Sequence, residues 1–247
     1  MKPEYSGIKA VLLDIEGTTT PIDFVYKTLF PYAREQVYDF VLKNGIDPKV
    51  NQILEKLRKS YNKNEAEGKE PEEWLKGDYV SMCNSAAKYL SWLMKMDSKD
   101  SCLKEMQGLI WEKGYKSGQL HGEVYSDVPD AFGKFQEEGK IIAIYSSGSV
   151  LAQKLIFSTT VYGDLTQHIS NFFDTGVGNK RDPESYTVIA NLLELEPNEI
   201  LFLSDILEEV QAARYSGMVS LQVIREGHST NKDPSAMKIS GLMELFS

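Results

Sequence analysis

The chain has 247 residues, of which 42% are hydrophobic and 26% charged, and its formal net charge is −9. This length accommodates one large domain or two small ones, and the acidic balance argues against a broad nucleic-acid-binding surface. No apolar run is long enough to span a bilayer, and the first residues, MKPEY, lack the apolar centre of a secretory signal. We therefore expect no membrane and no nucleic-acid partner.

The cysteines and histidines give no sign of a disulfide framework or a metal-binding cluster. Cys83 and Cys102 stand apart without a CxxC pair, which makes free thiols in a reducing compartment the expectation. His121, His168 and His228 show no metal-ligand spacing. We expect a cytoplasmic protein, with the nucleus as a further location if the source is eukaryotic.

The first predicted element is a buried strand at residues 10–13, because its sequence AVLL has no polar alternation. Asp14 ends this strand, and residues 14–20 read DIEGTTT. A carboxylate at the carboxyl end of such a strand lies at the crevice where open α/β sheets bind ligands. Asp14 there can accept a phosphoryl group as a covalent nucleophile, or it can merely cap the next turn.

Residues 23–123 carry helical periodicity and almost no strand pattern. We predict helices within 25–41, 53–57, 74–96 and 103–115, with the charged stretch 59–73 as a surface loop or helix end. The tryptophans at 74, 92 and 111 are expected in the core of this segment, with one of them lining the pocket as the alternative. Its length predicts a separate helical subdomain, which is a candidate cap that excludes water and selects substrate.

The remaining sequence alternates strands with helices. Strands are predicted at 141–145, 200–203 and 219–224, with a weaker one at 172–173, and helices begin at Asp127 and at Asp182. This alternation predicts an α/β fold with a doubly wound, mainly parallel sheet. We therefore expect an α/β core domain at 1–22 and 124–247 and a helical cap domain at 23–123.

Three further polar elements fall at or beside strand ends, where they would face Asp14. Ser146 and Ser147 begin the sequence SSGS, which can cradle phosphate through a hydroxyl and backbone N–H groups or simply cap a helix. Lys180 ends the sequence GVGNK and can neutralise a phosphate and the Asp14 carboxylate together. A solvated lysine is the alternative.

Asp205 follows the 200–203 strand, and Glu209 comes four residues later. Asp205 could share a divalent cation with Asp14, and Mg²⁺ prefers such hard oxygen ligands. Alternatively, Asp205 is a helix N-cap and Glu209 interacts with the helix dipole. Because Asp14, Ser146, Lys180 and Asp205 all fall at or beside strand ends, a shared phosphoryl-transfer site is the stronger interpretation.

The same residues, in order and spacing over essentially the whole chain, resemble the haloacid dehalogenase (HAD) superfamily. Five longer sequence segments resemble more specifically the enolase-phosphatase (acireductone synthase) family. These are DIEGTTTPI at 14–22, TLFPY at 28–32, IYSSGSV at 144–150, AQKL at 152–155 and LFLSD at 201–205. The resemblance implies a Rossmann-like HAD core with an inserted α-helical cap.

The resemblance also implies an activity. The enzyme would convert 2,3-diketo-5-methylthiopentyl-1-phosphate to acireductone and phosphate in methionine salvage, by enolisation and then Mg²⁺-dependent dephosphorylation through an aspartyl-phosphate. It would act on this small phosphorylated diketone as a monomer, with one Mg²⁺ per subunit and no partner protein.

Roles follow residue by residue from the resemblance. Asp14 would be the nucleophile and a metal ligand, Glu16 a metal ligand through its backbone carbonyl, and Asp205 the remaining metal ligand. Ser146 and Ser147 would hold the phosphate, Lys180 would pair with the phosphate and with Asp14, and Glu209 would orient Lys180 or a metal-bound water.

Glu16 departs from the wider superfamily, which mostly has aspartate there as the general acid and base. Its backbone carbonyl is unaffected, whereas the acid/base role of its longer side chain stays open. The base for enolisation is Glu16 or a cap residue. The alternatives are a HAD phosphatase for another small phosphorylated metabolite and, ranked low, a non-enzymatic receiver-like phosphoacceptor domain, which needs no such helical insertion.

Overall fold

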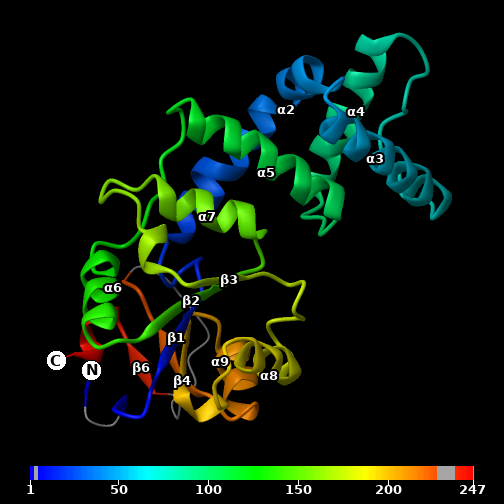
Figure 1. Ribbon diagram of the computed structural model, residues 1–247. Coiled ribbons are helices and arrows are strands. Elements are labelled where there is room, and N and C mark those ends of the chain that lie inside the picture. The colour runs from blue at the N-terminus through cyan, green and yellow to red at the C-terminus, as the bar shows by residue number, and fades with distance from the viewer. Residues whose placement is uncertain (3–4, 227–236, 247) are drawn as a thin grey trace. The chain divides into compact units, whose positions relative to one another are not determined.

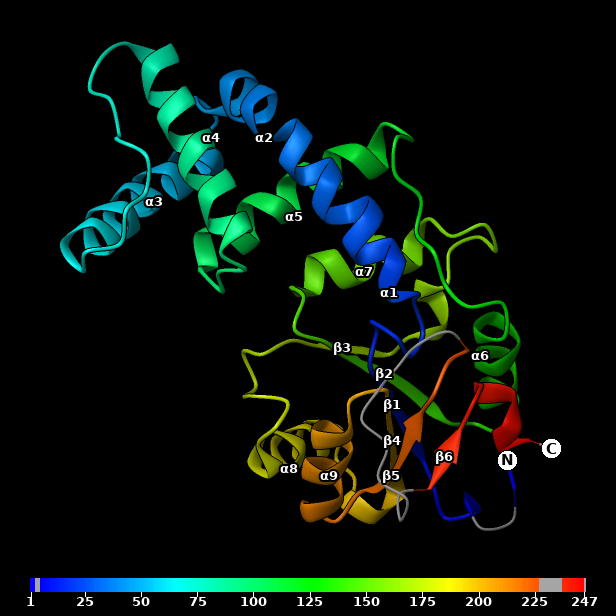
Figure 2. The same ribbon diagram turned by 180° about the vertical axis from the view of Figure 1, so that it is seen from behind.

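The computed structural model describes residues 1–2, 5–226 and 237–246. Two compact units are present: unit 1 comprises Met1–Val25 and His121–Ser247, and unit 2 comprises Tyr26–Leu120. Unit 1 holds the sheet and unit 2 is helical (Figures 1 and 2). No helix in the described part of the chain is long and apolar enough to cross a membrane.

Unit 1 is built on a parallel six-stranded sheet with the order β3-β2-β1-β4-β5-β6. The strands are β1 (Ala10–Leu13), β2 (Ile141–Tyr145), β3 (Asn171–Phe173), β4 (Ile200–Ser204), β5 (Val219–Val223) and β6 (Lys238–Ile239). In β1, Leu13 is paired with Ile144 of β2 and with Leu203 of β4. This register brings the carboxyl ends of the three central strands to the same edge of the sheet.

Helices cover both faces of this sheet (Figure 1). One face packs against α8 (Pro183–Leu192) and α9 (Leu207–Tyr215), and Leu12, Tyr145 and Phe202 lie in that core. Side chains alternate along a strand, so Val11 and Leu13 project to the other face, where α6 (Val128–Glu137) packs against β2. Unit 1 also contains α1 (Ile22–Phe24), α7 (Val150–Ser158), η3 (Thr166–His168), η4 (Pro197–Glu199) and η5 (Leu242–Leu245).

Unit 2 contains four long helices: α2 (Phe30–Asn44), α3 (Pro48–Ala66), α4 (Tyr79–Lys95) and α5 (Ser101–Lys116). The short helix η2 (Val25–Leu29) precedes them, and its first residue, Val25, still belongs to unit 1. Aspartates cap three of them, because Asp47, Asp78 and Asp100 accept hydrogen bonds from backbone N–H groups of the first turn. Each helix buries one apolar stripe, such as Ala33, Val37 and Val41 of α2. The unit therefore has a core of its own.

The predicted α/β fold with a parallel sheet is confirmed, and the elements differ from the prediction mainly at Trp74 and at β6. Trp74 does not begin a helix, since it lies in the loop before α4, where its backbone N–H donates to the Tyr61 hydroxyl. The first half of the charged stretch 59–73 is the end of α3, which runs to Ala66, so the helix-end alternative holds there; its charged residues line the exposed side of an amphipathic helix. The two-residue strand β6 carries too little pattern for sequence analysis to find.

Candidate functional site

The predicted site residues of unit 1 meet at the carboxyl edge of the sheet. Asp14 directly follows β1, Ser146 follows β2, and Asp205 follows β4. Lys180 comes from the loop between β3 and α8, and Glu209 lies in the first turn of α9. Parallel strands end at one edge, which is why residues nearly 200 positions apart become neighbours.

A buried cluster of charged groups forms around Lys180. Its ammonium Nζ lies 2.6 Å from Oδ1 of Asp14 and 2.7 Å from Oε2 of Glu209. The hydroxyl of Ser204 lies 3.2 Å from Oδ2 of Asp14 and 2.9 Å from Oε2 of Glu209, so it joins the same two carboxylates. Lys180 is 7% exposed, which excludes a solvated lysine.

The protonation of this cluster reflects burial and neighbouring charge. Burial alone would lower the pKa of Lys180, but Asp14 and Glu209 together raise it above its ordinary value. Burial, with the Asp14 charge next, raises the pKa of Glu209 to about 7. Burial and then Asp14 also raise the pKa of Asp205 to about 7 and the pKa of Glu16 above its ordinary value. The site therefore holds more acidic groups than its single ammonium neutralises.

The surroundings of Asp205 fit a bound cation. Its Oδ1 is buried and has no hydrogen-bond partner among the described residues, although a buried carboxylate oxygen ordinarily has one. Its Oδ2 faces Gly17 so closely that a Cβ there would lie 2.5 Å from it. Its backbone N–H donates to Thr18 Oγ1 at 3.0 Å and its carbonyl accepts from Gln222, so the chain around the carboxylate is fixed.

The helix-cap alternative for Asp205 is wrong, since Ile206 is the N-cap residue of α9. Within the described ranges, no three His, Cys, Asp or Glu side chains gather as a metal site. Mg²⁺ needs only one or two carboxylates and keeps several of its waters. Asp14 and Asp205, together with a backbone carbonyl, are therefore a sufficient ligand set for Mg²⁺.

The serine loop after β2 presents a hydroxyl and backbone donors. Ser146 is buried and its Oγ lies 3.3 Å from Oε2 of Glu16, while the N–H of Gly148 donates to the same Oγ at 3.1 Å. Ser147 is exposed beside it. The helix-capping role falls to Ser149, whose Oγ accepts from the N–H of Ala152 at the start of α7. Ser146 and Ser147 are thus not needed as caps.

Three buried side chains that sequence analysis did not single out anchor the loops of the site. Arg225 donates to the carbonyl of Thr18 at 3.0 and 2.6 Å and to both carboxylate oxygens of Asp127 at 2.9 Å. Gln153 donates to the carbonyls of Gly148 and Phe173, each at 2.8 Å. Gln222 donates to the carbonyl of Asp205 at 2.9 Å. In the sequence, Gln153 and Gln222 are only polar residues within apolar elements, and Arg225 is a charged residue just after β5. Nothing in these patterns indicates which loop each residue contacts.

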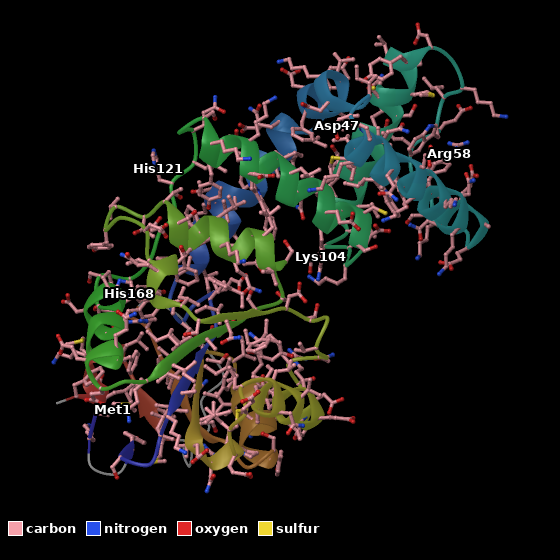
Figure 3. The ribbon with its side chains drawn as sticks, in the orientation of Figure 1. Met1, Asp47, Arg58, Lys104, His121 and His168 are labelled. Carbon is pink, nitrogen blue, oxygen red and sulfur yellow. The ribbon has the colours of Figure 1, made fainter. Side chains whose placement is uncertain are left out.

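The other described histidines, cysteines and tryptophans named from the sequence are not among the residues of this cluster. His121, labelled with His168 in Figure 3, is exposed. Nδ1 of His168 lies 2.6 Å from Oε1 of Gln136, and His228 lies outside the described residues. Cys83 and Cys102 are buried free thiols. Trp111 is 9% exposed in unit 2, as predicted, whereas Trp74 and Trp92 are only half-buried.

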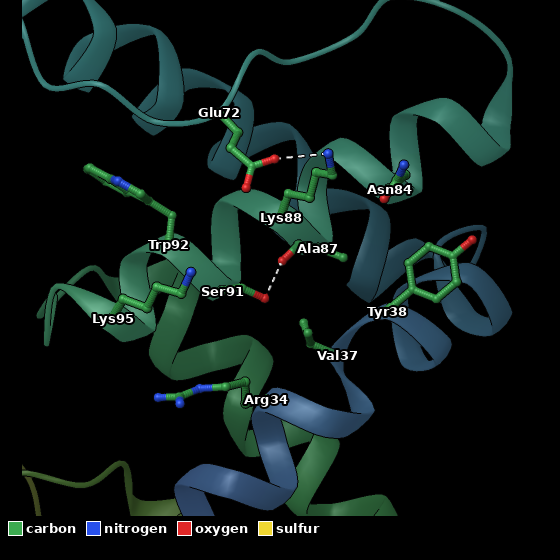
Figure 4. Close-up of a pocket in the computed structure, with 10 residues that line it drawn as sticks. All are labelled: Arg34, Val37, Tyr38, Glu72, Asn84, Ala87, Lys88, Ser91, Trp92 and Lys95. Carbon is green, nitrogen blue, oxygen red and sulfur yellow. Dashed lines mark hydrogen bonds and ion pairs between the residues drawn. The ribbon is translucent and has the colours of Figure 1, made fainter.

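Unit 2 has a separate pocket of about 210 Å³ between α2 and α4 (Figure 4). Arg34, Lys88 and Lys95 line it together with Trp92 and with Glu72, whose carboxylate lies 2.9 Å from the Lys88 ammonium. The pocket holds one carboxylate and none of the motif residues. The clustered carboxylates of the motif residues are in unit 1.

The chain is similar to known hydrolases over most of its length. Residues 8–217 match the family model described as haloacid dehalogenase-like hydrolase. The chain is 46% identical over 224 residues to enolase-phosphatase E1 of Synechococcus elongatus, covering 91% of this chain and 92% of the relative. It is 41% identical over 246 residues to enolase-phosphatase E1 of Drosophila grimshawi, covering 99% and 98%.

Solved structures show the same fold. The UTR4 protein of Saccharomyces cerevisiae superimposes with a TM-score of 0.77 at 31% identity, covering 95% of this chain and 98% of that one. L-2-haloacid dehalogenase from Xanthobacter autotrophicus, at 16% identity, superimposes with a TM-score of 0.52 over 96% of each chain, and therefore supports the fold alone.

Proposed function

The chain belongs to the haloacid dehalogenase-like hydrolases and, within them, to the enolase-phosphatase E1 family, and on this premise we propose that the Asp14 cluster is its catalytic site. The protein is the bifunctional enolase-phosphatase of methionine salvage. It converts 2,3-diketo-5-methylthiopentyl-1-phosphate to acireductone and phosphate by enolisation followed by dephosphorylation. A receiver-like phosphoacceptor domain is excluded by this membership.

In the proposed mechanism, Asp14 is the nucleophile. A carboxylate oxygen of Asp14 attacks phosphorus, the bond between phosphorus and the substrate oxygen breaks, and a general acid of the site gives its proton to the departing oxygen, which leaves an aspartyl-phosphate and the neutral alcohol-type product. Water then hydrolyses the aspartyl-phosphate and releases inorganic phosphate. The observation that carries this role is the contact of the buried Asp14 with Lys180, which reduces the repulsion between the carboxylate and an anionic phosphate.

Asp14, the Glu16 carbonyl and Asp205 would hold one Mg²⁺ per subunit. The Asp205 oxygen that lacks a hydrogen-bond partner among the described residues supports this assignment. When bound, Mg²⁺ would polarise the phosphoryl oxygens and offset their negative charge. Ser146 and Ser147 bind the phosphate, Lys180 pairs with it, and Glu209 orients Lys180.

The enolisation step needs a base and a stabilised enediolate. Burial raises the pKa of Glu16, which makes its carboxylate a better proton acceptor than an ordinary glutamate. Glu16 and a residue of the helical segment are the two candidates for this base. We propose that residues 23–123 act as a cap that selects the methylthio substrate and excludes water, in a monomeric cytoplasmic enzyme.

Asp14→Asn tests the assignment. With the diketo phosphate and Mg²⁺ present, phosphate release and enediol absorbance are followed together. Asp14→Asn is expected to abolish phosphate release, because the amide is not a nucleophile. Asp130→Asn, at an exposed aspartate in the first turn of α6, should leave it unchanged. Normal phosphate release by Asp14→Asn would contradict the mechanism. If the wild-type protein released phosphate from another phosphate ester but not from the diketo phosphate, the alternative of a HAD phosphatase for a different metabolite would be favoured.

A further inference from the structure

The backbone that carries Lys180 is held by three side-chain hydroxyls on three successive carbonyls. The Tyr145 hydroxyl donates to the carbonyl of Gly178 at 3.0 Å. The Ser185 hydroxyl donates to the carbonyl of Asn179 at 2.8 Å. The Tyr186 hydroxyl donates to the carbonyl of Lys180 itself at 2.6 Å. A loop outside regular secondary structure is thereby fixed at each residue leading to the ammonium.

The hydroxyl donors are themselves fixed by the hydrophobic core. Tyr145 and Tyr186 are fully buried, and their rings meet edge to face with centroids 5.6 Å apart. Tyr186 packs in the same way on Phe202 of β4, at 5.0 Å. Burial raises the pKa of both tyrosines, so their hydroxyls stay protonated donors at neutral pH. The sheet core thus determines where the two tyrosine hydroxyls lie, while Ser185 is placed by the first turn of α8.

The approach of this loop to α8 is close enough to require glycine. Gly178 has a φ of +141°, and a Cβ there would lie 2.1 Å from the Ser185 hydroxyl oxygen. On the other side of Lys180, the N–H of Arg181 donates to Oδ1 of Asn179 at 2.9 Å. Both sides of the lysine are therefore constrained.

A fixed backbone matters because a lysine side chain is long and flexible. Its ammonium must lie within hydrogen-bond distance of Asp14 and Glu209 at once. Tyr145 contributes a second time, since the Lys180 Nζ lies 5.6 Å from its ring centroid, within the range of a cation–π contact. The residues that hold the carbonyls are therefore in a position to set where the charge lies.

We propose that Tyr145, Ser185 and Tyr186 are positioning residues that set the Lys180 ammonium for phosphoryl transfer. The proposal rests on the proposed function, because it assigns Lys180 to the phosphoryl-transfer step. Each hydroxyl acts through the Lys180 backbone without touching the substrate. Their loss should lower kcat with little change in KM, because the displaced charge no longer matches the transition state.

Tyr186→Phe is the first test, in the full-length protein with Mg²⁺. It removes the 2.6 Å hydrogen bond and keeps the ring in the core. We expect kcat for phosphate release to fall about 10- to 100-fold, as for a small misplacement of a catalytic group. The matched control is Tyr115→Phe, which removes a buried hydroxyl of unit 2 that has no hydrogen-bond partner among the described residues. Equal kcat for the two variants would overturn the proposal.

A double-mutant cycle separates positioning from general loss of structure. Orthovanadate binding, as a mimic of the transferring phosphoryl group, is measured with Tyr186→Phe alone, Lys180→Met alone and both together. If the hydroxyl acts through the ammonium, Tyr186→Phe weakens vanadate binding in the Lys180 protein but not in the Lys180→Met protein. An equal weakening in both backgrounds would show a merely structural role.

The neighbouring hydroxyls provide a second test of the positioning role. If Tyr186→Phe does not fold, Tyr145→Phe and Ser185→Ala remove the neighbouring hydrogen bonds, and unchanged kcat in both would overturn the proposal. Failure of the proposed function shows differently, since the wild-type protein would then release no phosphate from the diketo substrate. The positioning role alone fails if the wild-type protein is active and the hydroxyl variants have the same kcat as Tyr115→Phe.

Discussion

Gly17 is the position where one added methyl group should disable the proposed metal site. Its φ is +75°, and its ideal Cβ would lie 2.5 Å from Oδ2 and 2.7 Å from Cγ of Asp205. Non-bonded carbon–oxygen contacts lie at about 3.3 Å or more. In Gly17→Ala the Asp205 carboxylate must therefore retreat by roughly 0.8 Å, from 2.5 Å to about 3.3 Å.

A shift of this size exceeds the tolerance of a catalytic group, which is about 0.5 Å. We therefore expect the Mg²⁺ concentration for half-maximal activity to rise and kcat to fall on the order of 100-fold. The left-handed backbone adds a cost to stability of about 1–2 kcal/mol for any residue with a Cβ. Loss of activity must be separated from this loss of stability.

The assay is phosphate release as a function of Mg²⁺ concentration, together with urea unfolding. Gly139→Ala is the control, because Gly139 has a similar φ of +68° at the end of α6 but nothing within 4 Å of an added Cβ. Both variants should lose similar stability, while only Gly17→Ala should lose activity and Mg²⁺ affinity. Normal Mg²⁺ dependence in Gly17→Ala, or an equal loss in Gly139→Ala, would refute the reasoning.

Two substitutions test the groups that support the cluster. Glu209→Gln removes one of the two carboxylates that contact Lys180. Urea unfolding should show that the free energy of unfolding falls by about 1.5–3 kcal/mol, the range for a hydrogen bond to a charged group. An unchanged free energy of unfolding would mean that Asp14 alone satisfies Lys180. Arg225→Lys replaces the guanidinium group that donates to both Asp127 carboxylate oxygens and to the Thr18 carbonyl. It should therefore destabilise the fold by about 3 kcal/mol. A lysine variant as stable as the wild-type protein would contradict this hydrogen-bond geometry.

Most of the correctly predicted elements follow from short local sequence patterns. The unbroken apolar sequence of residues 10–13 indicates a strand buried on both faces, and the structure has β1 there. The position of Asp14 at its carboxyl end follows directly from the order of the residues. The start of α8 was also predictable, because Asp182 and Pro183 are strong signals for the beginning of a helix.

Weaker local signals gave the errors. Trp74 fits a helical period with the residues after it, but α4 begins only at Tyr79, where Asp78 caps the first turn. The indole instead packs edge to face with the Tyr61 ring, with centroids 5.4 Å apart. Tertiary packing of an aromatic side chain outweighed local helix propensity at this position.

Sequence by itself determined the residue types available for chemistry and their places at the ends of strands, because strand burial and turn signals are local. Only the tertiary structure decided which of them touch. For Glu209 the sequence left open a first-turn glutamate and a partner of Lys180 or of a metal-bound water, and the structure has it 2.7 Å from the Lys180 ammonium. The three hydroxyls on the Lys180 loop and the Arg225 fork are likewise set by register and packing across the sheet. Such contacts join residues far apart in the chain, and no short-range pattern records them.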